Sequence, residues 1–156
     1  MNPSTRLHYA KAHSCFGEVF LVFDHHALYA CDFACPADQT HHFEYGATQA
    51  QYIANLIGQR DNQLTLHPIG TPFQQQVWQA LQHIPYGETR PYQAIAQAIG
   101  RPNAVRAVAN AIAHNPISWF IPCHRVIRSN GQLGGFAWGS ELKKTMLDWE
   151  QRHARA

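Results

Sequence analysis

The chain has 156 residues, of which 46% are hydrophobic and 14% are charged, and its formal net charge is +2 with neutral histidines. This length suits one ordinary domain or two small ones. No run approaches the roughly 18 apolar residues of a membrane span. The first residues, MNPSTRLHYAKAHS, lack the basic patch and apolar run of a secretory signal. We therefore expect a cytoplasmic protein without a membrane partner, whose four cysteines stay reduced.

The charge is divided unevenly between the two halves of the chain. Residues 1–70 hold three basic and six acidic residues, which gives −3, whereas residues 71–156 hold nine basic and four acidic residues, which gives +5. A basic second half is a mild indication of a polyanionic partner.

The first half is predicted to be a small α/β unit. The runs EVFLVF (18–23) and ALYACDF (27–33) are rich in β-branched and aromatic residues and flank Asp24-His25-His26, so they predict a β-hairpin. Residues 63–66 are expected to add a further strand. Residues 47–59 are expected to form a helix, because apolar side chains recur there at helical spacing, namely at Tyr52, Ile53 and Leu56.

A cluster of Pro and Gly at residues 67–72 marks the boundary between the halves. We therefore expect an N-terminal α/β domain over 1–68 and a mostly α-helical C-terminal domain over 69–156.

The second domain is predicted to contain four helices. The first has Thr71 as N-cap, Pro72 at its first position and Gln74 completing a capping box. Residues 92–100, which stop at Gly100, and residues 103–115 predict two short helices joined by a tight turn, which is a helix-turn-helix candidate. The last helix runs from Ser140 to about Arg152 and is expected to turn three apolar residues inward, namely Leu142, Met146 and Trp149.

The helix over residues 103–115 has two distinct faces. Val105, Val108 and Ile112 form an apolar stripe. The other face combines polar residues, small residues and a single cation, namely Asn103, Ala104, Arg106, Ala107, Asn110 and Ala111. Small residues around one arginine suit a helix that approaches DNA closely. Two alanine-rich helices packed in a core would give the same pattern, so spacing alone leaves both interpretations open.

The stretch I-P-C-H-R-V-I (121–127) places a cysteine between a proline and a basic pair. Neighbouring positive charge lowers the pKa of a thiol, so Cys123 is a candidate nucleophile with His124 as its base. A buried structural thiol remains an alternative, and metal binding is less favoured because no second ligand has standard spacing. A zinc site in the first half is a minor alternative that would use Cys31, Cys35, His25, His26, His41 and His42.

A series of motifs follows in order along the second half. They are F-x3-V-W-x2-L-x2-I-P-x-G-x-T-x2-Y, R-P-x-A-x-R-A-V, N-P, I-P-C-H-R-V-I and G-x-L-x-G-F-x-W-G. This order resembles the O6-alkylguanine-DNA alkyltransferases, also called methylated-DNA–protein-cysteine methyltransferases. The resemblance is dense from Thr71 to about Glu150 and thin over residues 1–66.

The resemblance implies that the protein repairs DNA by moving an alkyl group from O6 of guanine, or O4 of thymine, irreversibly to Cys123. His124 would act through a water as base toward the thiol, and Glu150 would orient the imidazole. Asn115 matches the residue that holds the turn before the cysteine. Tyr92 matches the tyrosine that protonates the leaving guanine at N3.

The resemblance also implies that double-stranded DNA is the partner. The helix with Ala104, Ala107 and Asn110 would enter the minor groove, and Arg106 would fill the gap left by a flipped nucleotide. No cofactor and no metal is implied, and we expect a monomer.

The alkyl-binding pocket implied by the resemblance comprises five residues, namely Ser118, Val126, Phe136, Ala137 and Trp138. Three of them depart from the commoner family pattern. Ser118 stands where some relatives have proline, Phe136 replaces a frequent tyrosine and Trp138 replaces a frequent glycine. The last two put the width of the pocket in question.

Two other functions are compatible with the same residues. One is a non-catalytic DNA damage sensor or regulator of the same fold, in which Cys123 is vestigial. The other is a cysteine hydrolase built on Cys123 and His124, which would turn over repeatedly and would not need Arg106 or DNA.

Overall fold

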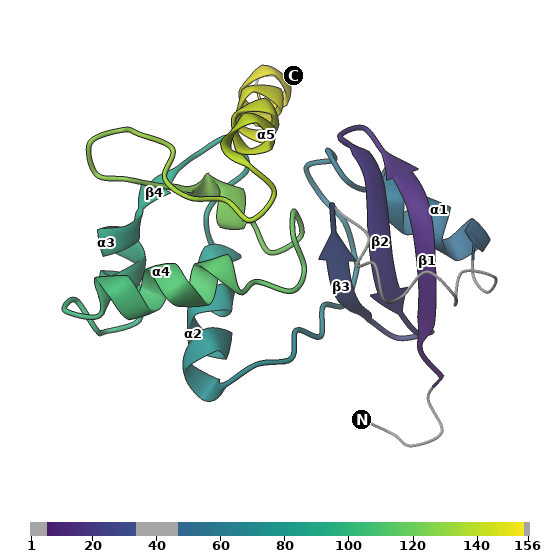
Figure 1. Cartoon of the computed structure of the whole chain (residues 1–156), viewed down its shortest axis with the longest axis horizontal. Coiled ribbons are helices and arrows are strands. Elements are labelled where there is room, and N and C mark those ends of the chain that lie inside the picture. The colour runs from purple at the N-terminus through teal and green to yellow at the C-terminus, as the bar shows by residue number, and fades with distance from the viewer. Residues whose placement is uncertain (1–5, 34–46, 155–156) are drawn as a thin grey trace. The chain divides into compact units, whose positions relative to one another are not determined.

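The structure, a computed structural model, describes residues 6–33 and 47–154 (Figure 1). The chain folds into two compact units. The first contains the described residues up to Pro68 together with Pro116–Ser118, and the second contains Ile69–Asn115 and the chain from Trp119 onward. Among the described residues, no helix combines the length and the apolarity needed to cross a bilayer.

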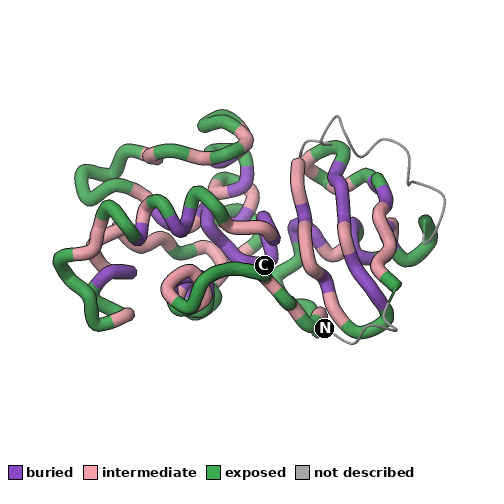
Figure 2. Tube along the Cα trace, turned by 60° about the horizontal axis from the view of Figure 1, so that its bottom comes forward, coloured by how far each residue is buried: buried purple, intermediate pink, exposed green. Residues whose placement is uncertain are grey.

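The first unit is built on a three-stranded antiparallel sheet in the order β1 (His8–Ser14), β2 (Gly17–Phe23) and β3 (Leu28–Asp32). The predicted hairpin of β2 and β3 is confirmed, with Leu21 opposite Cys31. Strand β1 was not predicted, because its sequence HYAKAHS holds no β-branched residue. The alternation of buried and exposed side chains along β1 appears only in the burial of Ala10 and Ala12. Figure 2 shows buried residues along this sheet.

Helix α1 (Ala47–Asn55) contacts β1, and its buried residues are Ala50, Ile53 and Ala54. The helix is confirmed, but its expected stripe is wrong at Tyr52, which is 62% exposed. The expected strand over residues 63–66 is also wrong. Only a single parallel bridge forms there, between Leu66 and Leu28, so the backbone pairing does not extend into a ladder.

The segment Pro116–Ser118 pairs with β3, although it lies far along the chain. The Cys31 amide donates to the Pro116 carbonyl at 3.0 Å, and the Ser118 amide donates to the Cys31 carbonyl at 3.0 Å. The chain therefore passes through the first unit shortly before it reaches Cys123.

The second unit begins with helix α2 (Pro72–Leu81), whose predicted capping box is confirmed. The Thr71 hydroxyl accepts from the Gln74 amide, and the Gln74 side chain accepts from the Thr71 amide. Helices α3 (Tyr92–Ala98) and α4 (Val105–Ala113) pack against each other and against α2. Gly100 has φ +75° in the turn that follows α3, a conformation that glycine adopts without strain.

The remaining elements of the second unit position the candidate site. A short parallel pair joins β4 (Arg90–Pro91) to β5 (Val126–Ile127), and the 3₁₀ helix η2 (Cys123–Arg125) precedes β5. Helix α5 (Ser140–His153) follows the loop after β5. A small sheet with a helix, followed by a mostly helical unit, confirms the expected fold class.

Helix α5 does not bury the face that was predicted. Met146 is buried as expected, but Leu142 and Trp149 are only half-buried. Lys143 and Glu150 are buried in their place, at positions i and i+7 with Met146 between them. Hydrophobic periodicity misplaces the inner face because two charged side chains lie on it.

Candidate active site

Cys123 is the first residue of η2 and is only 6% exposed. Its amide donates to the Ile121 carbonyl at 2.8 Å, and the Asn115 side chain donates to the same carbonyl at 2.8 Å. Burial raises the pKa of the Cys123 thiol, while a hydrogen bond from Asn115 and the positive charge of Lys143 oppose that rise. The thiol is therefore protonated at neutral pH and needs a base to become a nucleophile.

His124 and Glu150 form a buried pair next to this cysteine in the chain. His124 Nε2 lies 2.5 Å from Glu150 Oε2, and both side chains are inaccessible to solvent. Burial lowers the pKa of His124 despite the opposing effect of the carboxylate, so the imidazole is neutral at pH 7. Burial alone would raise the pKa of Glu150, but the hydrogen bonds and charges of His124 and Arg125 outweigh it and lower that pKa to about 2.

This protonation pattern determines which imidazole nitrogen can act as a base. A neutral imidazole that donates its Nε2 proton to the Glu150 carboxylate carries its lone pair on Nδ1. Within the described residues, the buried Nδ1 of His124 has no hydrogen-bond partner. The arrangement can therefore accept a proton at Nδ1 while Glu150 stabilises the imidazolium that forms.

Glu150 is also held by groups other than His124. Arg125 donates to the carboxylate through Nε at 2.8 and 3.1 Å and through Nη2 at 3.0 Å, and its Nη1 donates to the Ile84 carbonyl. The Gly87 amide donates to Glu150 Oε1 at 3.0 Å. With both oxygens engaged, the carboxylate that orients His124 is itself fixed.

Trp119 covers one face of the His124 imidazole. The two rings are stacked, with centroids 4.9 Å apart and planes inclined by 7°. Trp119 is 3% exposed and has φ +72°. It is the only non-glycine residue with a positive φ in the described part of the chain. For a side chain with a Cβ, such a backbone costs about 1–2 kcal/mol.

Tyr92, the first residue of α3, lies against the loop between β5 and α5. A Cβ added to Gly134 would come within 3.0 Å of the Tyr92 hydroxyl oxygen, so this loop approaches the phenol closely. Burial and the nearby Cys123 raise the pKa of Tyr92, against the effect of Arg128. The phenol therefore stays protonated and can donate.

Lys143 is a further group that the sequence did not reveal. Its Nζ donates to the Gly135 carbonyl at 3.2 Å and lies 6.0 Å from the centroid of the Tyr92 ring. Burial lowers its pKa to about 8, against the effect of Cys123. A lysine in the polar run SELKK is typical of a solvated surface. The only available signal was its i, i+3, i+7 spacing with Met146 and Glu150.

The residues expected to line the alkyl pocket differ in their exposure. Val126 is buried, Phe136 and Trp138 are half-buried, and Ala137 is exposed. The Phe136 carbonyl accepts from the Gly139 amide, which closes the turn that carries the three loop residues. Ser118 is buried and belongs to the first unit.

One face of helix α4 is polar and exposed to solvent. Arg106, Ala107 and Asn110 are exposed, and the Arg106 side chain makes no hydrogen bond or ion pair with another described residue. Ala104 is half-buried at the N-cap, whereas Ala111 is buried, so its placement on the polar face was wrong. The Ala111 carbonyl accepts from Trp78 Nε1 at 2.8 Å, which explains why α4 packs on that side.

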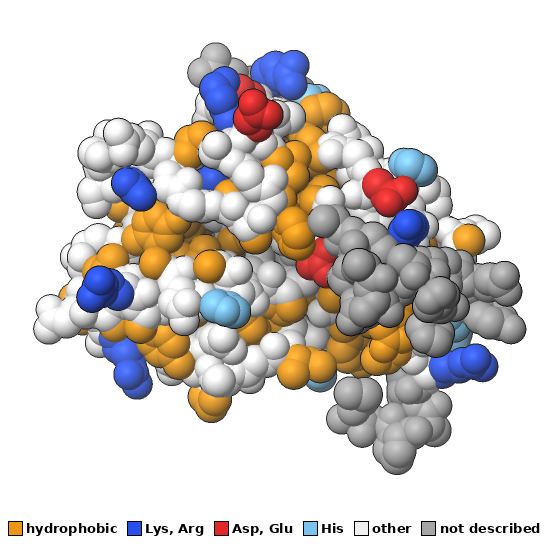
Figure 3. Space-filling view, viewed as in Figure 1, with side chains coloured by type: hydrophobic (Ala, Val, Ile, Leu, Met, Phe, Trp, Pro, Cys, Tyr) orange, Lys and Arg blue, Asp and Glu red, His pale blue; other side chains and the backbone are white. Residues whose placement is uncertain are grey.

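The chain around this helix is free of acidic residues. From Thr89 to Ser140 the sequence holds five arginines and neither aspartate nor glutamate. Toward the left of Figure 3, where α3 lies, basic side chains are visible and acidic ones are not. Such a surface attracts a polyanion.

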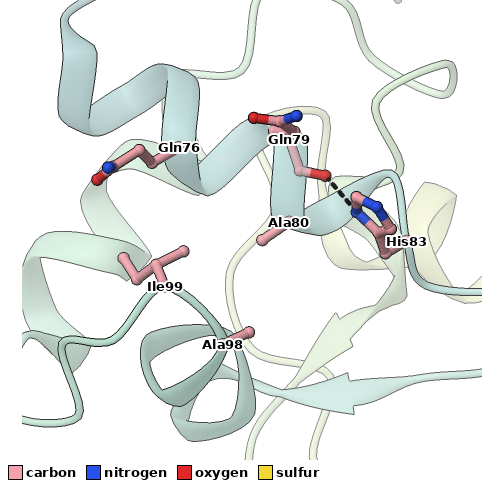
Figure 4. A pocket seen from close by; sticks show the side chains of 6 residues that line it. All are labelled: Gln76, Gln79, Ala80, His83, Ala98 and Ile99. Carbon is pink, nitrogen blue, oxygen red and sulfur yellow. Dashed lines mark hydrogen bonds between the residues drawn. The ribbon is translucent and has the colours of Figure 1, made fainter.

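One hollow is lined by residues other than those of the candidate site. This hollow of about 400 Å³ separates α2 from the end of α3 and is lined by Gln76, Gln79, Ala80, His83, Ala98 and Ile99 (Figure 4).

Within the described residues no group of His, Cys, Asp and Glu could hold a metal ion. Of the zinc alternative, Cys35, His41 and His42 lie outside the described residues.

One helical unit carries a buried cysteine, a buried His–Glu pair and a helix with an exposed arginine. Together, these features define a class of protein. Residues 72–152 match the family described as 6-O-methylguanine DNA methyltransferase, DNA binding domain. The chain is 50% identical over 105 residues to a methylated-DNA–protein-cysteine methyltransferase of Mycolicibacterium paratuberculosis, covering 67% of this chain and 62% of that protein. It is 56% identical over 100 residues to the bifunctional transcriptional activator/DNA repair enzyme Ada of Escherichia coli, covering 62% of this chain and 28% of that protein.

A solved structure extends the similarity over nearly the whole chain. The structure of Mycobacterium tuberculosis OGT in complex with DNA is 39% identical, with a TM-score of 0.81, and 93% of each chain is covered. The chain spans less than two thirds of the length of the two curated relatives named above. The chain belongs to the O6-methylguanine DNA methyltransferase family, as the motifs indicated.

Proposed function

We propose that this protein repairs alkylated double-stranded DNA by transferring the alkyl group from O6 of guanine to the Sγ atom of Cys123. The observation that carries the proposal is the buried His124–Glu150 pair directly after the buried Cys123, in a chain that belongs to a DNA methyltransferase family. O4-alkylthymine is proposed as a second substrate.

The reaction is a displacement at the alkyl carbon. The Sγ–C bond forms while the C–O6 bond breaks, and its electron pair goes to guanine O6. The thiol proton passes through a water to His124 Nδ1, and Glu150 stabilises the resulting imidazolium. Asn115 supports the turn that carries the thiol, through its hydrogen bond to the Ile121 carbonyl.

A guanine anion leaves poorly, so the leaving group needs a proton. Tyr92 supplies it at N3 of the base, because burial keeps its phenol protonated. The proton gained by His124 balances the one lost by Tyr92. No cofactor takes part, because the alkyl group passes straight to the protein.

Access to O6 requires the nucleotide to leave the base stack. Helix α4 enters the minor groove with its exposed small residues, and Arg106 fills the space that the flipped nucleotide leaves. The absence of acidic residues between Thr89 and Ser140 supports this orientation. We propose that the protein acts as a monomer.

The alternative of a non-catalytic damage sensor is not favoured, because curated relatives at about half identity are named as methyltransferases. A cysteine hydrolase would share Cys123 and His124 but would make no use of the exposed Arg106.

The test is to incubate the full chain with a duplex that contains O6-methylguanine and to measure its intact mass. One added methyl group, mapped to Cys123, is expected. An unchanged mass with retained binding would contradict transfer and support a sensor. Cys123→Ser should bind the duplex without gaining a methyl group, whereas the matched control Cys15→Ser, at an exposed cysteine, should react like the wild type.

A further inference from the structure

Five side chains of the second unit, the imidazole of His124 among them, form a closed ring of contacts. Glu150 binds both His124 and Arg125. The Arg125 guanidinium lies over the Tyr86 ring at 5.4 Å, and Tyr86 meets Trp119 edge-on at 6.2 Å and 77°. Trp119 closes the ring by stacking on His124. Glu150 and Trp119 therefore contact the imidazole directly, and Arg125 and Tyr86 contact these two side chains.

The hydrogen bond to Glu150 alone does not determine where His124 Nδ1 points. It fixes the position of Nε2 but leaves the plane of the imidazole free to tilt about that bond. The indole is nearly parallel to the imidazole, with only 7° between the planes, so it removes this tilt. It also keeps water from one face of a ring whose Nδ1 is buried.

The strained backbone conformation of Trp119 supports a functional role for its side chain. A positive φ is easy for glycine and unfavourable for a residue with a Cβ, and strain of this kind persists where the surrounding structure enforces it. Here the strained residue lies four positions before Cys123, and its ring contacts the candidate base. The strain therefore coincides with a contact to the reacting groups.

We propose that Trp119 is a positioning residue for the transfer reaction, which acts by holding the plane of the His124 imidazole so that Nδ1 points toward the thiol of Cys123. This role in repair rests on the proposed function. The orientation of the His124 imidazole toward the Cys123 thiol, however, can be tested without DNA. Trp119 acts through His124 and does not touch the alkyl group.

The test measures methylation of Cys123 by methyl iodide in the full chain, with the site of methylation located by peptide mapping. This reagent forms the same Sγ–CH₃ bond and releases iodide, and the thiol proton goes to His124. Trp119→Leu, which keeps apolar bulk but no flat face, is expected to lower the rate about tenfold at neutral pH, a fraction of what a general base contributes. Trp119→Phe keeps a flat ring and is expected to stay within about threefold of the wild type.

A second pair of variants distinguishes positioning from general support of the fold. In a His124→Ala background, Trp119→Leu should change the methylation rate by less than about twofold, because its partner is gone. If the tenfold effect persists in that background, or if the Phe variant falls as far as the Leu variant, the proposal is overturned. Should Trp119→Leu not fold, Trp119→Met, a more adaptable filler, takes its place in the same comparison.

The two proposals fail separately in this design. Methyl iodide involves no DNA, so its reaction tests Trp119 even if the chain takes no methyl group from O6-methylguanine. Transfer from DNA that proceeds at equal rates in the wild type, Trp119→Leu and Trp119→Phe would leave the proposed function intact and overturn the role of Trp119.

Discussion

At the scale of single residues, the site depends most on Glu150, because four separate interactions converge on its carboxylate. His124, the Nε and Nη2 atoms of Arg125 and the Gly87 amide all bind it. Breaking a buried pair of this kind leaves the other charge uncompensated, which is strongly destabilising. Function and stability are therefore coupled at this position.

Glu150→Gln is expected to slow transfer about a hundredfold, because the neutral amide no longer stabilises the imidazolium of His124. Single-turnover rates on an O6-methylguanine duplex measure this change. The matched control is Asp148→Asn, which alters an exposed acid on the same helix that pairs with Lys144. Equal rates in the wild type and Glu150→Gln would remove Glu150 from the proposed mechanism.

Glu150→Gln is also expected to change how the stability of the fold depends on acidic pH, and the sign of the change follows from the pKa of Glu150. The folded pKa of Glu150 is about 2, below its usual 4.5, so the carboxylate contributes stability that is fully present above about pH 4.5. That contribution is lost as the pH falls toward 2. Thermal unfolding between pH 7 and pH 2 should show a steep acid loss in the wild type and a shallower one in Glu150→Gln.

Lys143→Met is expected to stabilise the fold and weaken the reactivity of Cys123 at once. The folded pKa of Lys143 is about 8 against a usual 10.5, so its burial penalty is fully present below pH 8 and disappears as the pH rises to 10.5. The methionine avoids this penalty, with a gain on the order of a few kcal/mol in the free energy of unfolding at pH 7.

The loss of reactivity in Lys143→Met follows from charge. The lysine cation favours the thiolate of Cys123, so its removal should slow methylation of the thiol at neutral pH. Denaturant unfolding and thiol methylation rates measure the two effects. Lys144→Met, at an exposed neighbour, is the control. Unchanged reactivity at Cys123 would contradict an electrostatic role for Lys143.

Trp138 leads to a prediction about the size of the alkyl group. An indole beside the pocket would crowd a benzyl group and leave a methyl group untouched, at a cost of about 1–3 kcal/mol, or roughly ten- to two-hundred-fold in rate. Free O6-benzylguanine should therefore inactivate the protein poorly, and Trp138→Gly should sensitise it. Rapid inactivation of the wild type, with no gain in the variant, would show that Trp138 does not crowd the pocket.

At the scale of secondary-structure elements, the DNA contact proposed for helix α4 is separate from the chemistry proposed at Cys123. Arg106 projects from its exposed face, while Val108, Ala111 and Ile112 anchor the opposite face in the core. A side chain on the exposed face can therefore be changed without disturbing the packing of the helix.

Arg106→Ala is expected to slow repair in duplex DNA at least tenfold more than reaction with a free O6-alkylguanine base. The reason is that, in the proposed mechanism, Arg106 acts on the vacated base stack and not on the alkyl carbon. Rates on the two substrates measure the difference, and Arg152→Ala, an exposed arginine on α5, is the control. Equal losses on both substrates would assign Arg106 to the chemistry or to the fold.

At the scale of the whole molecule, each chain is expected to react once. A thioether has no leaving group as good as guanine, and the proposed mechanism contains no step that removes the methyl group from Cys123. Repaired lesions plotted against protein should reach a plateau at one lesion per chain. Continued repair by a fixed amount of protein would instead indicate a catalyst that turns over.

Much of the fold could be predicted from local signals in the sequence. The capping box at Thr71, the stop at Gly100 and the hairpin of β2 and β3 all depend on neighbours within a few residues. Strand β1 pairs with its neighbour β2 in a local hairpin, but its sequence lacks the β-branched residues that predict a strand. The bridge at Leu66 could not be predicted, because its partner Leu28 is distant in the chain.

For the candidate site, the motif I-P-C-H-R-V-I indicated Cys123 and His124, and the family resemblance implied Glu150. Only the tertiary structure showed the buried face of α5, the cation of Lys143 beside Tyr92 and the stacking of Trp119 on His124. The physical reason is that burial and ring contacts arise when segments far apart in the chain pack together. Hydrophobic spacing predicts which residues prefer the interior, but charged residues enter it only where the packed structure supplies their partners.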